Sequence, residues 1–386
     1  MRRAGLAALA VAASGFVLAG CMDGTVRDPP GEAAGGQGSG GKKKGSEAGQ
    51  GGEDEGSGGG QAKPGAVSFA AVGDTAMGVT PELPPSPQTY FEPIEGELRA
   101  DVVFGNLEGT LTDVSEDVKC EEDAKPGTCY AFRAPPEYAG YLHEAGFNVM
   151  SLANNHSYDF GEAGQRETVE SLHRAGIEPV GIPGRTAFVE VGPTKIAFLG
   201  FASYDYTNSL TDLEGARALI RKARKRADVV VVANHAGAEG SDATHVTGET
   251  EIYLGEDRGN PEEFAHMAVE AGADLVLGSG PHVLRGMEIY RDRLIAYSLG
   301  NFSGFHNFDV SGVLGASAIL HVTVDKDGAF RSGRISSVRL VEAGQPVLDS
   351  SGESADIIRE LSHEDLGNSA VRIGDDGRIL GTVGGG

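Results

Sequence analysis

Short apolar runs alternate with amphipathic segments along most of the chain between residues 66 and 341. The apolar runs are rich in Val, Ala, Leu and Phe, a composition typical of buried strands, and they cover residues 66–72, 101–104, 147–152, 228–233 and 273–277. Apolar residues at helical spacing lie between several of these runs and predict helices over residues 161–174, 213–226 and 261–270. A helix is also expected over roughly residues 90–98, before the second run. Strands that alternate with helices are typical of the α/β class.

The pattern changes after residue 282, where strands follow one another without intervening helices. Strands are expected over residues 286–290, 294–297, 315–324 and 330–341. The last two are expected to form a hairpin with a turn at Asp327-Gly328. A single domain over residues 66–345 accounts for these elements, and residues 346–386 are expected to form a C-terminal appendage.

The first 65 residues differ in composition from the rest. Met1-Arg2-Arg3 precedes an apolar segment that ends in Leu18-Ala19-Gly20-Cys21, and this arrangement resembles the signal peptide and lipobox of bacterial lipoproteins. The resemblance implies a signal peptide over residues 1–20, a lipid on Cys21 and an extracytoplasmic protein anchored to a bacterial membrane. A plain secretory signal that contains a cysteine is the alternative. Gly, Ser, Lys and Glu dominate the stretch after Cys21, so residues 21–65 are expected to form a lipidated, disordered tether.

The chain of 386 residues carries a formal net charge of −24. This excess of acid argues against a nucleic-acid partner, because the phosphate backbone would be repelled. An anionic substrate would be repelled as well, unless a metal ion or nearby arginines reverse the local field. Any site for an anion must therefore be built locally.

Polar side chains that can bind metals follow the five apolar runs. They are Asp74, Glu108, Asn155, His235 and His282. Each alone is explained by a turn, but the carboxyl ends of strands are where α/β proteins bind ligands. Carboxylate, amide and imidazole groups without a thiolate suit Mn, Fe or Zn. We therefore predict two divalent ions bridged by Glu108, with His156 as the proton donor to a leaving group.

Cys120 and Cys129 are the thiols that remain when Cys21 is assigned to the lipid. An exported chain meets oxidising conditions, which favour a disulfide between them. A metal-binding pair is the alternative, although two isolated cysteines at this separation do not have the spacing of a zinc site.

Seven short motifs occur in order through the predicted domain. They are Gly73-Asp74, Gly105-Asn106-Leu107-Glu108, Phe132-Arg133-Ala134-Pro135-Pro136, Leu152-Ala153-Asn154-Asn155-His156, His235-Ala236-Gly237-Ala238-Glu239, Pro281-His282-Val283 and Tyr297-Ser298-Leu299-Gly300-Asn301-Phe302. Together they resemble the CapA family of poly-γ-glutamate capsule synthesis proteins, which is itself similar to calcineurin-like metallophosphoesterases.

The resemblance implies a four-layer αββα sandwich, a metal-dependent phosphoesterase-like site, and a role in making or exporting an anionic envelope polymer. It supports the same five metal ligands and gives Glu108 and His156 catalytic roles. It also places four residues near the substrate, namely Arg133, Glu239, Asn106 and Asn301. One departure bears on the metals: the family usually has a further histidine just before its Pro-His motif, where this chain has Ser279 and Gly280. One of the two metal positions is therefore expected to be weaker.

Three functions remain open at this point. The first is a metal-dependent hydrolase of a phosphoester in the envelope, which the ligand set supports. The second is a hydrolase or transferase of poly-γ-glutamate, which the family name alone supports. The third is a non-enzymatic lipoprotein that binds polymer, or belongs to a synthesis or export complex, on a degenerate phosphatase scaffold, and the missing histidine favours it.

Overall fold

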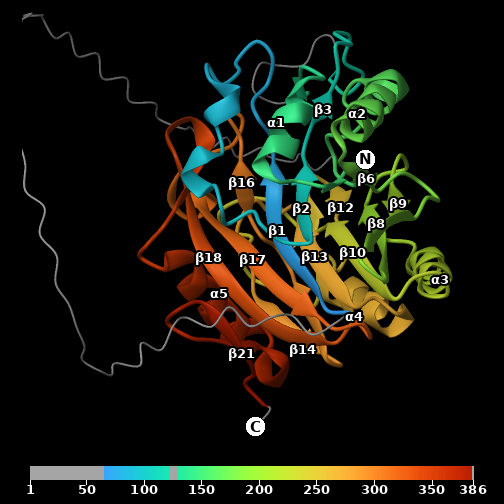
Figure 1. Ribbon diagram of the computed structural model, residues 1–386, viewed down its shortest axis with the longest axis vertical. Helices are drawn as coiled ribbons and strands as arrows, with labels where there is room; N and C mark the ends of the chain where they lie inside the picture. The colour runs from blue at the N-terminus through green and yellow to red at the C-terminus, as the bar shows by residue number, and fades with distance from the viewer. Residues whose placement is uncertain (1–64, 121–128, 385–386) are drawn as a thin grey trace, which may run out of the picture. The chain divides into compact units, whose positions relative to one another are not determined.

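The computed structural model describes residues 65–120 and 129–384, and two β-sheets stand at its centre (Figure 1). The first sheet has the strand order β20 (Val371–Ile373), β21 (Arg378–Thr382), β18 (Phe330–Val341), β17 (Ala316–Val324), β1 (Val67–Thr75), β2 (Val102–Leu107), β5 (Val149–Ser151), β6 (Glu178–Val180), with β16 (Asn301–Ser303) beside β1 and β19 (Gln345–Leu348) beside β18. The second has the order β14 (Met287–Tyr290), β15 (Arg293–Ala296), β13 (Leu275–Ser279), β10 (Val229–His235), β8 (Thr194–Ala202), β7 (Ala187–Val191), with β9 (Asn208–Ser209) beside β8.

Two short strand pairs and five α-helices complete the described chain. The pairs are β3 (Thr110–Leu111) with β4 (Arg133–Ala134), and β11 (Ile252–Tyr253) with β12 (Glu256–Asp257). The helices are α1 (Tyr138–Ala145), α2 (Gly161–Ala175), α3 (Leu213–Arg224), α4 (Pro261–Ala271) and α5 (Glu353–Asp365).

Local sequence explains where these helices begin and end. The side chains of Asp212 and Asn260 accept hydrogen bonds from backbone N–H groups in the first turns of α3 and α4, which satisfies donors that a helix start leaves free. Helices α1, α2 and α4 each end at a glycine with left-handed backbone, the usual helix stop.

Alternate residues of the central strands face two different apolar cores. On β10, Val229 and Val231 belong to the core between the sheets, whereas Val230 and Val232 pack under α3 and α4. A strand that is buried on both faces needs apolar residues at every position. The uninterrupted valine run of β10 is therefore a consequence of its place in the middle of four layers.

Three apolar clusters define those layers. Phe69 and Phe104 of the first sheet meet Phe198 of the second in the core between the sheets. A second cluster packs α3 and α4 against the outer face of the second sheet, and a third packs α1 and α2 against the outer face of the first. Each fully buried Phe or Val side chain contributes about 1.5–3 kcal/mol through the hydrophobic effect. The fold is thus a four-layer αββα sandwich, as predicted.

Most predicted elements are present within a few residues of their expected bounds, including the β17–β18 hairpin. One predicted helix is wrong: residues 90–98 form a 3₁₀ turn, Glu92–Ile94, rather than an α-helix. Pro93 within this segment removes a backbone donor that a longer helix would need.

The C-terminal segment after residue 345 is built into the sandwich. Strand β19 pairs with β18, and β21 pairs with both β18 and β20. Ala355 and Ile358 of α5 are buried in the core between the sheets. The described part of the expected appendage therefore extends the first sheet. The proposed boundaries of the signal peptide and tether lie outside the described residues and stay a prediction.

The predicted disulfide between Cys120 and Cys129 is present. Cys21 and its lipid lie outside the described residues. Within the described ranges, none of the helices is both long and apolar enough to cross a membrane.

A partly buried ion pair connects α4 to the edge of the second sheet. His266 Nε2 lies 2.6 Å from Glu288 Oε1, and the Tyr297 hydroxyl donates to the same oxygen. Burial opposes both charges, but the pairing outweighs it: Glu288 raises the pKa of His266, and His266 lowers the pKa of Glu288. The charged pair therefore stabilises the folded chain between the ordinary pKa of a glutamate, 4.5, and that of a histidine, 6.5.

We expect Glu288→Gln to lower the free energy of unfolding by about 2–3 kcal/mol near pH 5.5, because hydrogen bonds to a charged acceptor are lost. The difference should shrink as the pH rises through the raised pKa of His266, and as it falls through the lowered pKa of Glu288. Urea unfolding of both proteins at several pH values measures it. Glu263→Gln changes an exposed residue on α4, the helix that carries His266, and is the matched control. A difference in the free energy of unfolding that does not change with pH would contradict the ion pair.

Candidate metal centre

Strand pairing brings together the polar residues that end the central strands. Strands β1, β2 and β5 run parallel, as do β8, β10 and β13, so their carboxyl ends meet at one edge of each sheet. Asp74 lies opposite both Asn106 on β2 and Asn301 on β16. His235 ends β10 in the second sheet, and its Nδ1 lies 3.8 Å from Asp74 Oδ1. The site therefore forms where the edges of the two sheets meet.

Asp74, Glu108 and His282 form the centre of the site. Each offers a ligand atom, and these atoms all lie within 4.8 Å of one another. His282 Nδ1 is 3.2 Å from Asp74 Oδ2, and its Nε2 is 3.6 Å from Glu108 Oε1. Both carboxylate side chains are fully buried, whereas that of His282 is 16% exposed. Three of the five predicted ligands are thus in place for one metal ion.

Amide side chains hold this centre in position. Asn106 donates to Asp74 Oδ1 at 2.8 Å, and Asn154 donates to Asn106 Oδ1 at 3.1 Å and to the Leu107 carbonyl at 2.8 Å. Asn301 Oδ1 lies 2.9 Å from His282 Nδ1. Asn106 and Asn301, predicted to lie near the substrate, thus contact the candidate metal ligands Asp74 and His282 directly.

Several ligand atoms are buried without a partner. Among the described residues, both carboxylate oxygens of Glu108, Oδ1 of Asn155 and Nε2 of His235 are buried and have no hydrogen bond. A buried polar atom without a partner costs about 1–3 kcal/mol, and more for a charged group. Other buried atoms, such as Ser171 Oγ and Ser317 Oγ, also lack a hydrogen bond, but these four belong to predicted metal ligands. Their chemistry fits a divalent ion of the Mn, Fe or Zn type, which would supply the missing partner.

The protonation states reflect two carboxylates that are buried together. Burial raises the pKa of Glu108 well above its ordinary range. Burial also disfavours a charge on His282, but Glu108, Asp74 and Glu239 outweigh it and raise the pKa of His282 to about 10. Asp74 keeps a lowered pKa despite burial, because of His282. In the absence of a metal, a proton on His282 balances the charge of Asp74.

The His235 ring is neutral, in contrast to the protonated ring of His282. Burial lowers the pKa of His235 to about 3, so the ring is neutral, as a metal ligand must be. Its Nδ1 lies 3.3 Å from the hydroxyl of Ser279. Nδ1 also lies 3.3 Å from the amide nitrogen of Asn106. Nε2 is buried and has no hydrogen-bond partner, so it is the candidate ligand atom of this ring.

The two positions that lack the family histidine have other roles. The Gly280 backbone N–H donates to Asp74 Oδ2 at 3.4 Å. Gly280 has a φ of +114°, and a Cβ there would lie 3.0 Å from the backbone nitrogen of Ala236. A histidine at position 280 would therefore be strained and crowded. At these two positions the Ser279 hydroxyl contacts His235, and the Gly280 N–H contacts Asp74.

The loop after β5 places His156 beside the centre. Its Nδ1 lies 2.7 Å from Asp159 Oδ2, its ring stacks on Phe132 at 4.0 Å, and Asn154 Oδ1 accepts from its backbone N–H. Burial lowers the pKa of His156, against the effect of Asp159. Asp159 and Asn154 shape this loop, as the sequence suggested, and Asn154 also supports the centre.

Glu239 and Arg258 border the centre on the side of the second sheet. Glu239 Oε2 lies 3.7 Å from His282 Nε2, and its other oxygen accepts from Arg258 Nη2 at 2.6 Å. The guanidinium of Arg258 lies between the rings of Tyr204 and Tyr253, at 5.5 and 5.4 Å from their centroids. Glu239 therefore connects His282 to a buried cation.

Arg133, the fourth residue predicted near the substrate, lies on β4. It lines a small hollow together with Glu108 and Gly109, and its guanidinium carbon is 5.7 Å from the centroid of the Phe160 ring. Two residues near the site were not predicted: Arg258 and Lys119. No motif in the sequence marks Arg258 as a site residue. Lys119 directly precedes Cys120, so the predicted disulfide was the one signal in the sequence near it.

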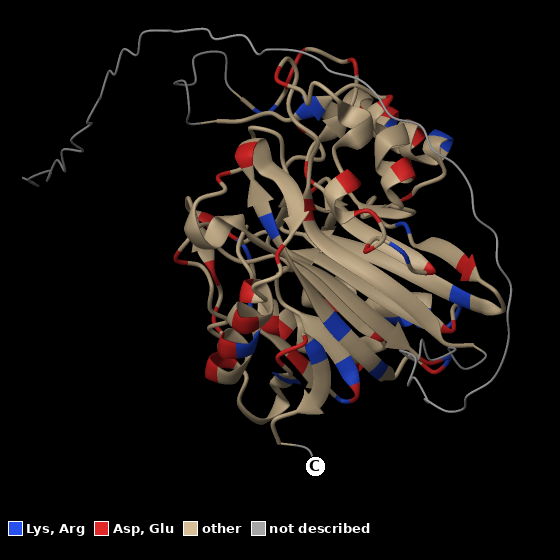
Figure 2. Ribbon diagram, turned by 60° about the vertical axis from the view of Figure 1, so that its left-hand side comes forward, with Lys and Arg blue, Asp and Glu red and all other residues tan. Residues whose placement is uncertain are grey.

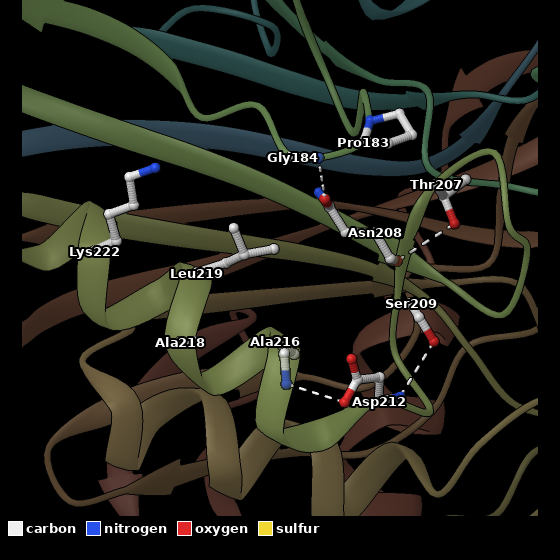
Figure 3. A pocket seen from close by; sticks show the side chains of 11 residues that line it. Pro183, Gly184, Thr207, Asn208, Ser209, Asp212, Ala216, Ala218, Leu219 and Lys222 are labelled. Carbon is white, nitrogen blue, oxygen red and sulfur yellow. Dashed lines mark hydrogen bonds between the residues drawn. The ribbon is translucent and has the colours of Figure 1, made fainter.

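A separate pocket lies beside α3, away from these residues, and Figure 3 shows its lining. Two of its polar residues are already paired: Asn208 accepts from the Gly184 N–H and donates to the Gly200 carbonyl, and Asp212 caps α3. Satisfied groups of this kind are structural. They contrast with the unpaired ligand atoms at the strand ends.

The fold and the gathered ligands define a class: a four-layer sandwich with a candidate metal centre of carboxylates, amides and imidazoles. The sequence profile of the family described as "Bacterial capsule synthesis protein PGA_cap" matches residues 68–304. The chain belongs to this family of capsule synthesis proteins.

Individual relatives agree with this assignment. The chain is similar to the "PGA biosynthesis protein CapA" of Bacillus subtilis, with 28% identity over 339 residues and 81% of each chain covered. It is 30% identical to the "Capsule biosynthesis protein CapA" of Bacillus anthracis, over 53% of this chain and 50% of that one. The match thus spans only about half the length of the second relative. Among solved structures, a putative 5'-nucleotidase from Staphylococcus aureus aligns with 77% of this chain and 58% of its own, at 13% identity and a TM-score of 0.41.

We expect Asn154→Ala to weaken metal binding about 10- to 100-fold, because Asn154 positions Asn106 and the loop that carries Asn155. Loss of its three buried hydrogen bonds should also lower the free energy of unfolding by about 2–4 kcal/mol. Manganese titration and urea unfolding measure the two effects. Ser157→Ala, which removes one long hydrogen bond of 3.4 Å in the same loop, is the control. Unchanged manganese affinity in Asn154→Ala would remove Asn154 from the support of the site.

Proposed function

We propose that the chain is a metal-dependent, phosphoesterase-like hydrolase that acts in the synthesis of poly-γ-glutamate capsule or a related envelope polymer. The observation that carries the proposal is the set of buried, unpaired ligand atoms on Glu108, Asn155 and His235, beside the Asp74–Glu108–His282 cluster. Family membership supports the role in capsule synthesis. The names of the Bacillus relatives support the same role.

Five residues would hold two divalent ions of the Mn, Fe or Zn type. They are Asp74, Glu108, Asn155, His235 and His282, with Glu108 between the two ions. Bound metal would polarise a phosphoryl oxygen and lower the pKa of a water nucleophile. The weaker position is expected where the family histidine is replaced by Ser279 and Gly280.

The protein groups around the metals would bind the substrate and handle its proton. Asp159 holds the His156 ring through Nδ1 and would stabilise the imidazolium, so that His156 can deliver a proton to the leaving oxygen. Phe132 restricts the ring from one face. Arg133 would meet the anionic part of the substrate beside Glu108, while Glu239, Asn106 and Asn301 orient the metal ligands.

A second candidate is a non-enzymatic protein that binds polymer or joins a synthesis or export complex. The geometry at Gly280 favours it, because the chain there excludes a histidine that the family usually has. A third candidate, hydrolysis or transfer of poly-γ-glutamate itself, is favoured only by the names of the relatives. For each candidate we propose an extracytoplasmic protein held to the membrane through lipid on Cys21.

We expect the purified chain to bind manganese, iron or zinc and to hydrolyse an activated phosphodiester such as bis(p-nitrophenyl) phosphate. Glu108→Ala and His282→Ala should each remove most of the metal and lower kcat/KM by at least about 100-fold, because both supply ligands to the centre. Metal analysis and release of p-nitrophenol measure these effects. Glu263→Ala on α4 should behave like the wild type.

Three results separate the candidate functions. Metal binding with hydrolysis of the diester supports the phosphoesterase. Metal binding with shortening of poly-γ-glutamate, and no diester hydrolysis, replaces it with the polymer hydrolase. If the chain retains no metal after treatment with excess metal and removal of the unbound ions, both enzymatic functions are contradicted. The non-enzymatic binding function then remains.

We expect Cys21→Ser to move the protein from the membrane fraction to the soluble exported fraction, because the acyl chains would have no attachment site. Fractionation followed by immunoblotting measures the shift. Metabolic labelling with a fatty acid should mark the wild type and not the variant. A variant that stays with the membrane to the same extent would refute the lipid anchor.

A further inference from the structure

Lys119 lies against the loop that carries Asn155 and His156. Its ammonium donates to the Asn155 carbonyl at 2.9 Å and lies 2.9 Å from His156 Nδ1 and 3.4 Å from His156 Nε2. It is also 3.2 Å from Asp159 Oδ1. Lys119 thus contacts the loop of Asn155 and His156, although it lies 37 residues before His156 in the sequence.

Asp159 anchors the chain on both sides of the disulfide. Its carbonyl accepts from the Val118 N–H at 2.8 Å, and its Oδ2 accepts from the Phe132 N–H at 2.7 Å. Between these two anchored positions the chain is closed by the bond from Cys120 to Cys129. The disulfide therefore connects the two segments that contact His156, one through the Lys119 ammonium and the other through the Phe132 ring.

The charge of Lys119 matters because cations are scarce in this chain. The formal net charge is −24, and Figure 2 shows Lys and Arg dispersed among more numerous acidic residues over the described chain. The Lys119 ammonium places a positive charge 3.2 Å from Asp159 Oδ1 and 2.9 Å from His156 Nδ1, beside the metal centre. It is therefore a local source of the positive field that an anionic substrate requires.

With the proton of His156 on Nδ1 and donated to Asp159 Oδ2, the Lys119 ammonium has two acceptors, the Asn155 carbonyl and Asp159 Oδ1. One of its three N–H donors therefore remains for a ligand. The Asp159 carboxylate is shared with the Phe132 N–H and the His156 ring, so Lys119 is one of three partners of that charge. The Lys119 side chain is 29% exposed, whereas that of Asp159 is fully buried. An ammonium group carries three donors on a flexible stem and binds phosphate as a point charge.

We infer that Lys119 is a substrate-binding residue that pairs with a phosphoryl oxygen beside the metal centre, and that the Cys120–Cys129 disulfide holds it there. The inference rests on the proposed function in naming a phosphoryl group as the ligand. It adds a requirement: the site has its full affinity for a phosphate oxyanion only after the two cysteines are oxidised. No covalent step on the substrate is assigned to Lys119.

The test measures binding of inorganic phosphate to the manganese-treated whole chain by calorimetry, without any need for turnover. Lys119→Met should weaken phosphate binding at least about tenfold, the effect of losing a charge-assisted hydrogen bond. Lys119→Arg should recover most of the affinity, whereas Lys195→Met, which removes a cation that lies over Phe188, should leave it unchanged. Thermal unfolding of each variant separates lost affinity from lost folding.

The disulfide is tested by combining variants. The double variant Cys120→Ser with Cys129→Ser should weaken phosphate binding about as much as Lys119→Met, and the two changes together should weaken it no further. A full additional loss when the cysteines are replaced in the Lys119→Met background would overturn the link between the disulfide and Lys119.

The remaining outcomes decide the role of Lys119 independently of the proposed function. Phosphate affinity that is unchanged in Lys119→Met, or absent in the wild type, overturns the inference even if the diester is hydrolysed. Phosphate affinity that depends on Lys119 supports the inference even if no diester is hydrolysed, a result that would count against the enzyme alone.

Discussion

The burial of two carboxylates next to one another, Asp74 and Glu108, is the constraint on which the rest of the site depends. Taking a carboxylate out of water costs several kcal/mol unless a cation or a full set of hydrogen bonds replaces the solvent. Asp74 has such partners in Asn106, His282 and the Gly280 N–H, whereas Glu108 has none among the described residues except the nearby charge of His282. The imbalance is relieved by a cation that both carboxylates can reach, and this requirement favours a metal ion over a purely structural ion pair.

The sandwich supplies the rigidity that such an arrangement needs. Strands β1 and β2 belong to one sheet and β10 to the other, and each is buried on both faces by apolar residues. Side chains at the ends of packed strands have little freedom to move apart, so their mutual repulsion cannot be relieved by a loop movement. The residues proposed to bind the substrate lie outside the two sheets: Arg133 is on the short strand β4, and Lys119 is on the segment before the disulfide.

Much of this could be predicted from the sequence, because strand ends carry a local signal. The apolar runs before Asp74, His235 and Ser279 correctly indicated strands, and family motifs indicated which of their neighbours lie together. Lys119 and Arg258 escaped prediction because their positions depend on contacts between distant segments. Pairing of β19 and β21 with β18 was also missed, since strands this short carry too few residues to show a period.

The backbone at Ser279 and Gly280 contributes to the site through the hydrogen bond from Gly280 to Asp74. A glycine at position 280 lets the backbone N–H reach Asp74 Oδ2, and the left-handed conformation that allows this contact is costly for a histidine. Pro281 separates this turn from His282, which also has a positive φ, of +62°. Backbone strain next to a ligand persists only where the surroundings hold it, and here the hydrogen bond to Asp74 and the contact of His282 with Asn301 do so. The chain thus lacks one side-chain ligand but gains a backbone donor that stabilises the negative charge on Asp74. A negative charge on Asp74 is what a divalent cation beside it would need, so the backbone donor at Gly280 is compatible with the proposed metal centre.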